Sequence, residues 1–338
     1  MAVEAQTVET YDNSLIFENL QNAYTMLSPI ECPFQQAVGT GSADATNYEW
    51  PVVELNDADE TNRVVEGDDN PATDDPTLGV RLANFTQISD KKVSVSHTSE
   101  AVDAAAMNLQ RIGKQISFKL KELKRDKELM LLQNIAASAG NSGVARTMAG
   151  FPAFLRTNTV FAAGGADPTL SGITEGYPDT PATPGTAPVP LAEDMLNDAI
   201  QMAWEAGGNP TLGLVNANNK RIISETFVGN ATRYKDTVDQ KVINSIDFYE
   251  SDFGTITIVP TRFLLPMDGR GGVSFAVLLI DPDFVHILYL ETIREKPLAE
   301  TGHSRKRLIW CEYTLQVDNE AAHAIIRDTD GILPTPTP

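Results

Sequence analysis

Apolar residues recur every three or four positions along residues 99–135, which is the spacing of one face of a helix. The pattern predicts one helix of roughly 35 residues and about 50 Å, with Ser99 as its N-cap. The charged residues between positions 119 and 128 predict that the other face of this helix meets solvent or a partner. Seven residues define the apolar stripe: Val102, Ala105, Leu109, Ile112, Ile116, Leu120 and Leu123.

Alternating apolar and polar residues before this helix predict two strands, at 46–55 and 84–98, that form a long hairpin. The segment between the strands is acidic and rich in turn residues, with almost nothing to bury. A two-stranded hairpin is marginally stable alone in water. We therefore expect its few apolar side chains to need a partner surface: Trp50, Val52, Val53, Val93 and Val95.

The segment after the long helix, residues 164–190, is rich in Pro, Gly and Thr and long for a loop within a compact domain. We expect it to be an exposed or inter-subunit element. The patterns beyond it predict a second domain and a strand-rich end of the chain: helices at 191–206 and 217–227, and strands at 211–216, 243–261, 273–280, 284–290, 305–317 and 321–327.

The charge of the chain is uneven. The formal net charge is −20, and residues 1–90 hold 17 acidic and two basic residues, a net −15. Strong acidity argues against general nucleic-acid binding, because such affinity comes mainly from phosphate neutralisation. The acidic region either serves solubility or meets basic patches of a neighbouring subunit through residues such as Glu66, Asp68 and Asp69. The candidate basic patches contain Arg111, Lys121, Arg125, Arg305 and Arg307.

Motifs of enzyme chemistry are absent from the sequence, which has no P-loop, GxGxxG, GxSxG or HExxH. Its four histidines lack ligand spacing, so we expect structural roles for them, with no cofactor, no metal and no enzymatic activity. The run Asp68-Asp69-Asn70 offers oxygen ligands but lacks the spacing of a calcium loop, which favours a solvated turn. No apolar run is long enough to span a membrane, and the acidic N-terminus does not resemble a signal peptide.

Two further residue pairs leave alternatives open. Cys32 and Cys311 lie far apart without a CxxC motif, which predicts a reducing compartment and two buried thiols. A cysteine hydrolase that uses either thiol is the least favoured hypothesis. Lys91 and Lys92 lie on the predicted hairpin, where they either protect an edge strand or form an isopeptide bond with a neighbour's Asn.

The order of acidic arm, long hairpin, long helix, second domain and long final strand resembles the major head protein of tailed bacteriophages, which has the α+β Hong Kong 97-type fold. Local motifs are similar to one head-protein family found in several podoviruses. The arm and hairpin resemble it through SPIECPFQQAVGTGSADATNYEW and VVEGDDN. The helix end, the central domain and the closing strands resemble it through KELKRDKELMLLQN, AGGNPTLGLVNANNKRIIS and TGHSRKRLIWCEYTLQVDNEAAHAII.

The resemblance implies an arrangement in which the loop lies over one neighbour, the arm clasps another and the axial domains meet around five-fold and quasi-six-fold axes. The inter-subunit contacts would include Trp50, Lys91 and Lys92 besides the charged residues named above. The implied segments are an N-terminal arm at 1–35, an extended loop at 36–98, a peripheral domain with the spine helix and Pro/Gly-rich loop at 99–190, an axial domain at 191–290, and closing peripheral strands with the C-terminal tail at 291–338.

The function implied by the resemblance is that of a major capsid protein. Its copies would assemble into pentamers and hexamers of the icosahedral head that encloses the double-stranded DNA of a tailed phage, without sequence-specific binding. Further expected partners are portal, scaffold and minor head or decoration proteins. The expected location is the virion, after assembly in the cytoplasm of the bacterial host. The main alternative is an encapsulin-like shell of a cellular nanocompartment that encloses enzyme cargo.

Overall fold

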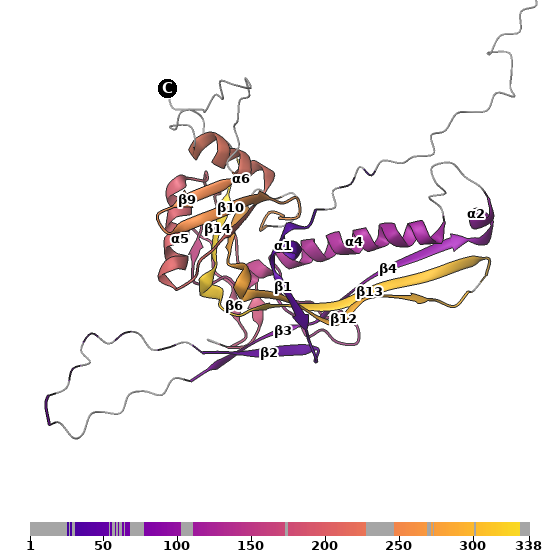
Figure 1. The fold of residues 1–338 in the computed structure, drawn as a ribbon, viewed down its shortest axis with the longest axis horizontal. Helices are drawn as coiled ribbons and strands as arrows, with labels where there is room; N and C mark the ends of the chain where they lie inside the picture. The colour runs from indigo at the N-terminus through magenta and orange to yellow at the C-terminus, as the bar shows by residue number, and fades with distance from the viewer. Residues whose placement is uncertain are drawn as a thin grey trace, which may run out of the picture. The chain divides into compact units, whose positions relative to one another are not determined.

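The computed structural model divides into two compact units (Figure 1). One unit comprises residues 1–30, 91–121 and 295–309, and the other comprises residues 31–90, 122–294 and 310–338. The structure describes residues 26, 28, 31–53, 55, 58, 60, 63, 65–67, 78–102, 111–172, 175–227, 247–268, 272, 274–300 and 302–331.

The larger unit contains a six-stranded mixed sheet of order β5-β14-β11-β8-β10-β9. Strand β8 is antiparallel to β11 and parallel to β10. Residues far apart in sequence meet here, since β14 pairs with both β11 and β5. The strands are β5 (Thr159–Val160), β8 (Leu212–Val215), β9 (Phe248–Ser251), β10 (Gly254–Pro260), β11 (Phe275–Ile280) and β14 (Ala324–Thr329).

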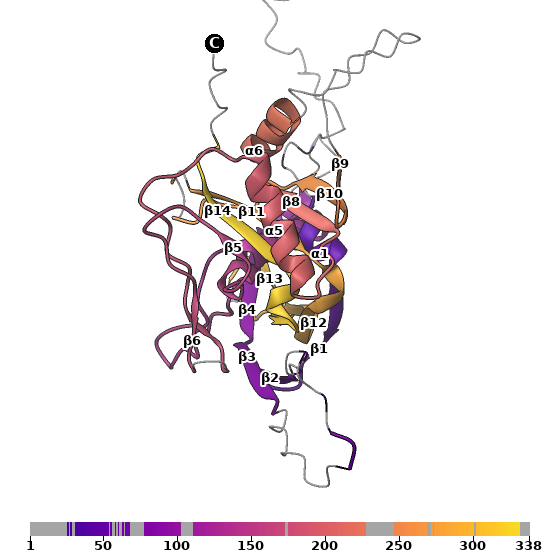
Figure 2. The same cartoon turned by 90° about the vertical axis from the view of Figure 1, so that its left-hand side faces the viewer.

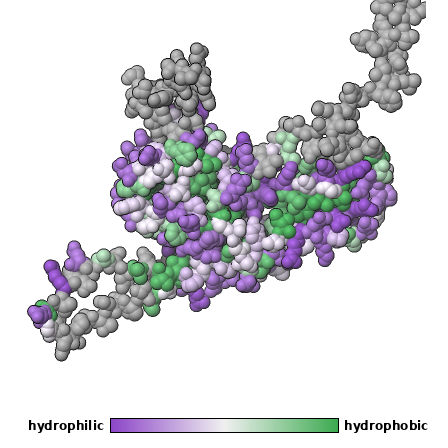
Figure 3. All heavy atoms as spheres, viewed as in Figure 1, coloured by the Kyte–Doolittle hydropathy of each residue, from purple (hydrophilic) through white to green (hydrophobic). Residues whose placement is uncertain are grey.

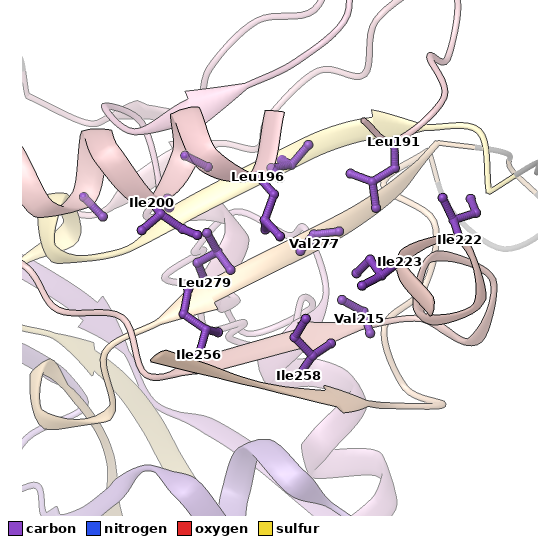
Figure 4. Close-up of a cluster of buried hydrophobic side chains, with 14 residues drawn as sticks. Leu191, Leu196, Ile200, Val215, Ile222, Ile223, Ile256, Ile258, Val277 and Leu279 are labelled. Carbon is purple, nitrogen blue, oxygen red and sulfur yellow. The ribbon is translucent and has the colours of Figure 1, made fainter. Parts of the chain in front are cut away.

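Helices α5 (Glu193–Glu205) and α6 (Ala217–Ile222) cover one face of this sheet (Figures 1 and 2). Apolar residues three or four apart on α5 supply its buried stripe, as an amphipathic helix requires. The π-helical turn η3 (Ile223–Phe227) continues α6. The core that they form with the sheet is shown in Figure 4 and contains Leu191, Leu196, Ala199, Ile200, Ala203, Val215, Ile222, Ile223, Ile256, Ile258, Val277, Leu279, Ala324 and Ile326.

The sequence of each strand explains its place in the sheet. The strands β8 and β11 are uninterrupted apolar runs, and both are buried along almost their whole length, as central strands covered on two faces should be. The edge strand β9 instead alternates exposed and half-buried residues. Helix α5 ends where Gly207 adopts φ +86°, a conformation that glycine reaches without strain.

The predicted domain boundaries at 191 and 291 do not follow this sheet. Strand β5 comes from the predicted peripheral segment 99–190, and β14 comes from the predicted closing segment 291–338, yet both lie beside the strands of the predicted axial domain. The expectation that β14 belongs with the peripheral strands is therefore wrong. The sheet to which a strand belongs depends on its pairing with distant segments, and the local periodicity of a sequence does not predict that pairing.

A second sheet has four strands in the order β1-β12-β13-β4. Strand β1 runs parallel to β12, with Gly39 opposite His286 and Ser42 opposite Tyr289. Strand β13 confirms the long closing strand that the sequence predicts at 305–317, whereas β12 continues to Pro297, beyond the end predicted at 290. The four strands are β1 (Gly39–Ser42), β4 (Gln87–Ser96), β12 (Val285–Pro297) and β13 (Ser304–Val317).

The hairpin differs from its predicted form. Strand β2 (Asn47–Val52) pairs antiparallel with β3 (Val80–Phe85), whereas β4 joins the four-stranded sheet. The chain changes sheet at the buried Thr86, whose hydroxyl donates to Glu312 Oε1 at 2.6 Å. The single returning strand predicted at 84–98 is therefore two strands with different partners.

The long helix predicted at 99–135 is also interrupted. Helix α2 (His97–Ala101) is capped by Ser96, whose hydroxyl accepts from Ser99 N at 3.1 Å, so Ser99 is not the N-cap. Val102 ends α2 with an extended backbone. Residues 103–110 lie outside the described part of the chain, and α4 (Ile112–Leu132) spans about 32 Å at 1.5 Å per residue.

The Pro/Gly-rich segment 164–190 is fixed to its own subunit wherever the structure describes it. The backbone of Gly176 donates to Arg81 O and accepts from Ala83 N, which extends the ladder of β3. The Asn134 side chain holds the backbone of Ala182 through two hydrogen bonds. These contacts lie inside one subunit, although most described residues of the segment are exposed or half-buried, as the sequence predicts. Its contact with a neighbouring copy stays a prediction. The segment contains β6 (Thr169–Leu170) and β7 (Pro178–Thr180).

The same segment carries the partner of a fully buried cation. Arg327 on β14 donates to Asp167 and to the Ala166 carbonyl, and its guanidinium lies over the Phe161 ring. A buried charge is tolerated only when it is paired and hydrogen-bonded. This ion pair therefore ties the segment to β14, the strand next to the edge strand β5 of the six-stranded sheet. The remaining short helices are α1 (Pro33–Ala37), η2 (Phe151–Ala153), η4 (Pro282–Phe284) and η5 (Glu320–Ala322).

Candidate assembly surfaces

Large apolar side chains are exposed on the loop between β2 and β3. The exposed fractions are 60% for Val53, 80% for Leu55, 80% for Val65 and 78% for Leu78. Figure 3 shows apolar surface at the root of this loop. Single exposed apolar residues are ordinary, whereas larger exposed apolar patches mark sites that bind a partner. Four on one loop make this loop a candidate contact surface. Sequence reasoning identified Val53 alone among these four; the signal it missed is isolated Leu and Val in an otherwise polar, acidic stretch.

Trp50 lies inside the subunit instead of at an interface. Its side chain is 4% exposed, its Nε1 donates to Val317 O at 3.1 Å, and its ring packs 6.2 Å from that of Phe154. Val93 and Val95 are buried as well. The expectation that these three side chains need a neighbour's surface is wrong, because the subunit itself covers them.

The predicted basic contact residues are mostly engaged within their own unit. Arg305 pairs with Glu100 at 3.0 Å, and Arg307 pairs with Glu295 at 3.3 Å. The Arg125 guanidinium lies 5.8 Å from the Phe263 ring centroid. Each of these three guanidinium groups therefore already has a favourable electrostatic contact within its own unit. Their use as docking points for an acidic loop stays a prediction.

The structure places the other predicted contact residues as follows. Glu66, Lys92 and Arg111 are exposed, and Lys91 is half-buried on β4. Lys121 Nζ lies 3.9 Å from Met26 Sδ. Asp68 and Asp69 lie outside the described residues, so their predicted contacts and the turn that contains them are not described. The isopeptide hypothesis for Lys91 and Lys92 involves a second subunit and stays a prediction.

Two charged residues of α4 are buried, against the prediction of a solvated face. Lys127 Nζ donates to the Tyr289 hydroxyl and lies 5.9 Å from the Tyr313 ring centroid. Glu128 is fully buried and accepts hydrogen bonds from Phe34 N and Gln35 N at 2.8 and 3.1 Å. Sequence reasoning missed both because a Lys-Glu pair in a charged run has the composition of a surface.

A second group of exposed apolar side chains lies on α5 and β9, and its members are aromatic. Trp204 at the end of α5 is 53% exposed although its ring lies 5.3 Å from that of Phe253. Phe248 on the edge strand β9 is 68% exposed. Aromatic side chains are enriched at protein interfaces, so this edge is a further candidate contact surface.

Both thiols are buried, as the sequence predicts. Burial raises the pKa of Cys32, with a further contribution from the nearby Glu128 carboxylate. Burial also raises the pKa of Cys311 to about 11. A reactive cysteine needs a lowered pKa, because the thiolate is the nucleophile. These surroundings disfavour the hydrolase hypothesis.

Other kinds of site find no support in the described part of the chain. Among those residues, no group of three or more His, Cys, Asp or Glu side chains is arranged to hold a metal ion. No described helix is long and apolar enough to cross a membrane. An open groove between β5 and α5 is lined by Thr159, Val160, Phe161, Asp198, Gln201 and Met202. It is mostly open to solvent, which suits a surface depression better than a pocket that encloses a small molecule.

A buried histidine predicts acid sensitivity of the subunit. His323 is fully buried, its Nδ1 accepts from Asp281 N at 3.0 Å, and burial lowers its pKa from 6.5 to about 3. The unfolded chain takes up this proton as the pH falls below 6.5, whereas the folded chain resists it down to about pH 3. Stability is therefore lost as the pH falls, by about 3 kcal/mol between pH 7 and pH 4 for this group.

Urea unfolding of the unassembled subunit at pH 7 and pH 4 measures this effect. The matched variant is His323→Asn, whose side-chain oxygen can still accept from Asp281 N but does not titrate. The variant should be less stable at pH 7, because it fills less space beside Phe151, and should show a smaller loss on acidification. An equal loss in both proteins would contradict the assignment to His323.

Comparison with known proteins gives one family and a set of solved structures. The family model described as SU10 major capsid protein matches residues 4–330. A search of curated proteins gives no match.

Three solved structures illustrate the shared fold. A chain of Gordonia phage Cozz has a TM-score of 0.61 at 11% identity, over 96% of each chain. The capsid of cyanophage P-SCSP1u has a TM-score of 0.55 at 10% identity, over 93% of this chain and 92% of that chain. The holo-SrpI encapsulin complex from Synechococcus elongatus has a TM-score of 0.56 at 12% identity, over 99% of each chain. At such identities the likeness concerns the fold alone.

Proposed function

The chain belongs to the SU10 major capsid protein family, and from this premise we propose that its copies close into an icosahedral head through the extended loop and the N-terminal arm. The fold is the Hong Kong 97-type fold, with both sheets and helices. As a major capsid protein, the chain is a component of the virion. The arrangement of copies into pentamers and hexamers is part of this proposal.

One observation carries the role of the loop. Its two ends are fixed by the β2–β3 pairing and by the burial of Trp50, whereas four large apolar side chains between those ends are exposed. Full burial of a Leu or Val side chain stabilises an association by about 1.5–3 kcal/mol. A closed symmetric shell repeats each such contact many times. The ends of the loop are thus fixed to the subunit, while its apolar side chains remain exposed, and a second copy could bury them.

Charge has a secondary role in this proposal. An exposed ion pair contributes about 0–1 kcal/mol, and Arg305 and Arg307 already have partners in their own unit. We therefore propose that the apolar side chains supply most of the contact energy, and that the acidic residues fix how one copy is aligned with the next. The net charge of −20 would limit adhesion of packaged double-stranded DNA to the shell.

Portal, scaffold and decoration proteins are proposed partners, and assembly in the host cytoplasm is part of the same proposal.

An encapsulin-like shell is the second candidate, because the SrpI encapsulin shares the fold over 99% of both chains. Fold similarity cannot separate the two functions. The match to a family of major capsid proteins favours the phage head. Nothing in the described residues supports catalysis, so we also propose that the protein is not an enzyme. The contents of native particles separate the two shells, since a phage head holds DNA and an encapsulin holds protein.

A double substitution tests the role of the loop. Leu55→Asp with Leu78→Asp places a carboxylate on each exposed apolar position and should prevent closed shells, because desolvating unpaired charges at a contact is unfavourable. Both side chains are about four-fifths exposed, so subunit stability should change by about 0.5 kcal/mol or less. Negative-stain microscopy and urea unfolding measure the two effects. The matched control is the pair Leu55→Met and Leu78→Met, which stays apolar and should assemble. Normal shells from the aspartate variant would refute the role given to these residues.

A further inference from the structure

The root of the N-terminal arm contains a short helix that does not cap itself. Helix α1 begins at Pro33, which has no N–H, and Cys32 at the N-cap position provides no side-chain cap. The following N–H groups, of Phe34 and Gln35, are the donors that the start of a helix leaves without a partner in the helix. They need an acceptor from another part of the chain.

Glu128 supplies that acceptor from more than 90 residues away. Its Oε1 accepts from Phe34 N at 2.8 Å, and its Oε2 accepts from Gln35 N at 3.1 Å and from Gln35 Nε2 at 2.9 Å. The Gln35 side chain also donates to Lys124 O, one turn earlier on α4. One carboxylate thus binds two consecutive backbone N–H groups and one side chain of the arm, which is the bonding of a helix N-cap.

Apolar packing reinforces this contact. Phe34 is fully buried, with its ring centroid 5.6 Å from that of Phe151. Immediately downstream, Gly39 begins the strand that pairs with β12, opposite His286. The root of the arm, residues 31–38, is therefore fixed by Glu128, by the buried Phe34 side chain and by the start of β1.

Burying the Glu128 carboxylate is unfavourable unless hydrogen bonds to the carboxylate offset the loss of its hydration. Glu128 has no exposed surface, and desolvation raises its pKa in spite of the bonds from Phe34 and Gln35. Lys127 beside it directs its ammonium to Tyr289. An apolar residue could fill the same space without that penalty. A carboxylate can accept hydrogen bonds from two neighbouring N–H groups at once, one on each oxygen, whereas an apolar side chain accepts none.

We propose that Glu128 is the positioning residue for the N-terminal arm: its carboxylate fixes residues 31–38 against α4 and so fixes the point at which the arm proposed to contact a neighbouring copy joins the folded subunit. The inference rests on the proposed function of the arm in assembly. It adds a residue on α4 that determines where the arm is attached. Loosening residues 31–38 would leave the arm covalently present but without a fixed attachment point.

The test is Glu128→Gln in the full-length chain, read by hydrogen exchange of unassembled subunits and by electron microscopy after assembly. The amide has one acceptor oxygen and turns an NH₂ group towards an N–H donor. Exchange in residues 31–38 should therefore accelerate roughly ten- to hundredfold, while β11 keeps its protection. Gln35→Met, which removes one donor to the same carboxylate, should give a smaller acceleration. The matched control is Glu205→Gln at the end of α5, which should change neither readout.

The outcomes separate this inference from the proposed function. Faster exchange confined to the root, with fewer closed shells, supports the positioning role. Unchanged exchange at the root overturns it, and so does equal acceleration throughout the chain, which would mean general destabilisation. A loosened root with normal shells also overturns it. If the unsubstituted chain forms no shells, the proposed function fails, while the exchange data still decide whether Glu128 fixes the root.

Discussion

Replacing residues 56–77 with a short Gly-Ser linker will leave a folded subunit that no longer forms closed shells. The β2–β3 ladder ends at Val52 opposite Val80, so the replacement leaves its pairing intact. The buried contacts of Trp50 also stay. Shortening a loop changes its closure entropy only weakly, so the free energy of unfolding should change by about 1 kcal/mol or less. Assembly should fall to background, because the replacement removes Val65 and also the length of chain that separates Leu55 from Leu78 at the proposed contact.

Urea unfolding and negative-stain microscopy of the same preparation measure these two effects. The control is a replacement of equal length that scrambles residues 56–77 but keeps Val65 in place. It keeps all four exposed apolar side chains, so it should fold equally well and still assemble. Normal particles from the linker variant would remove the loop from the assembly mechanism.

The second large effect is on folding. Trp50→Ala should destabilise the subunit by about 3–5 kcal/mol, the range for truncating a large buried aromatic residue. The variant also leaves the Val317 carbonyl without the donor that Trp50 provides, at a site closed to water. An inter-subunit contact residue would behave differently, since its truncation would reduce assembly and leave subunit stability unchanged.

Chemical denaturation of unassembled subunits decides between these behaviours. Trp204→Ala is the matched control, because Trp204 is more than half exposed and contacts Phe253. Its truncation should cost about 1 kcal/mol through the lost aromatic pair. Equal effects of the two substitutions would contradict the burial of Trp50 within the subunit.

Elements with a clear local period could be predicted from the sequence. The helix α5, the apolar runs of β8 and β11 and the long β13 all appear close to their predicted positions. Each is decided by side chains within one element, which is the information that periodicity contains. The order of these elements along the chain, together with the local motifs, likewise sufficed to indicate a phage capsid protein.

Features that depend on distant partners could not be predicted in this way. Trp50 has the sequence context of an exposed hairpin, but its partner Val317 lies 267 residues away. Glu128 belongs to a charged run, and its partners lie more than 90 residues earlier. The segment 164–190 has the composition of a free loop, yet Gly176 joins the β3 ladder. In each case a tertiary contact overrides the local pattern.

The corrections change where assembly contacts are sought. Burial removes Trp50, Val93 and Val95 from the candidate surface, and internal ion pairs engage Arg305 and Arg307. Exposure adds Leu55, Val65 and Leu78 to it. The loop thus becomes an acidic segment with a few exposed apolar contact residues, attached to the subunit by the β2–β3 pairing and the buried Trp50.

Cryo-electron microscopy of the full-length chain, expressed alone and together with the other head proteins, tests the central claim most directly. The account predicts closed icosahedral particles in which the loop between β2 and β3 covers a neighbouring subunit and Leu55, Val65 and Leu78 are buried at that contact. A chain that stays monomeric at high concentration even with the other head proteins would contradict the account, as would shells in which these three side chains remain in solvent.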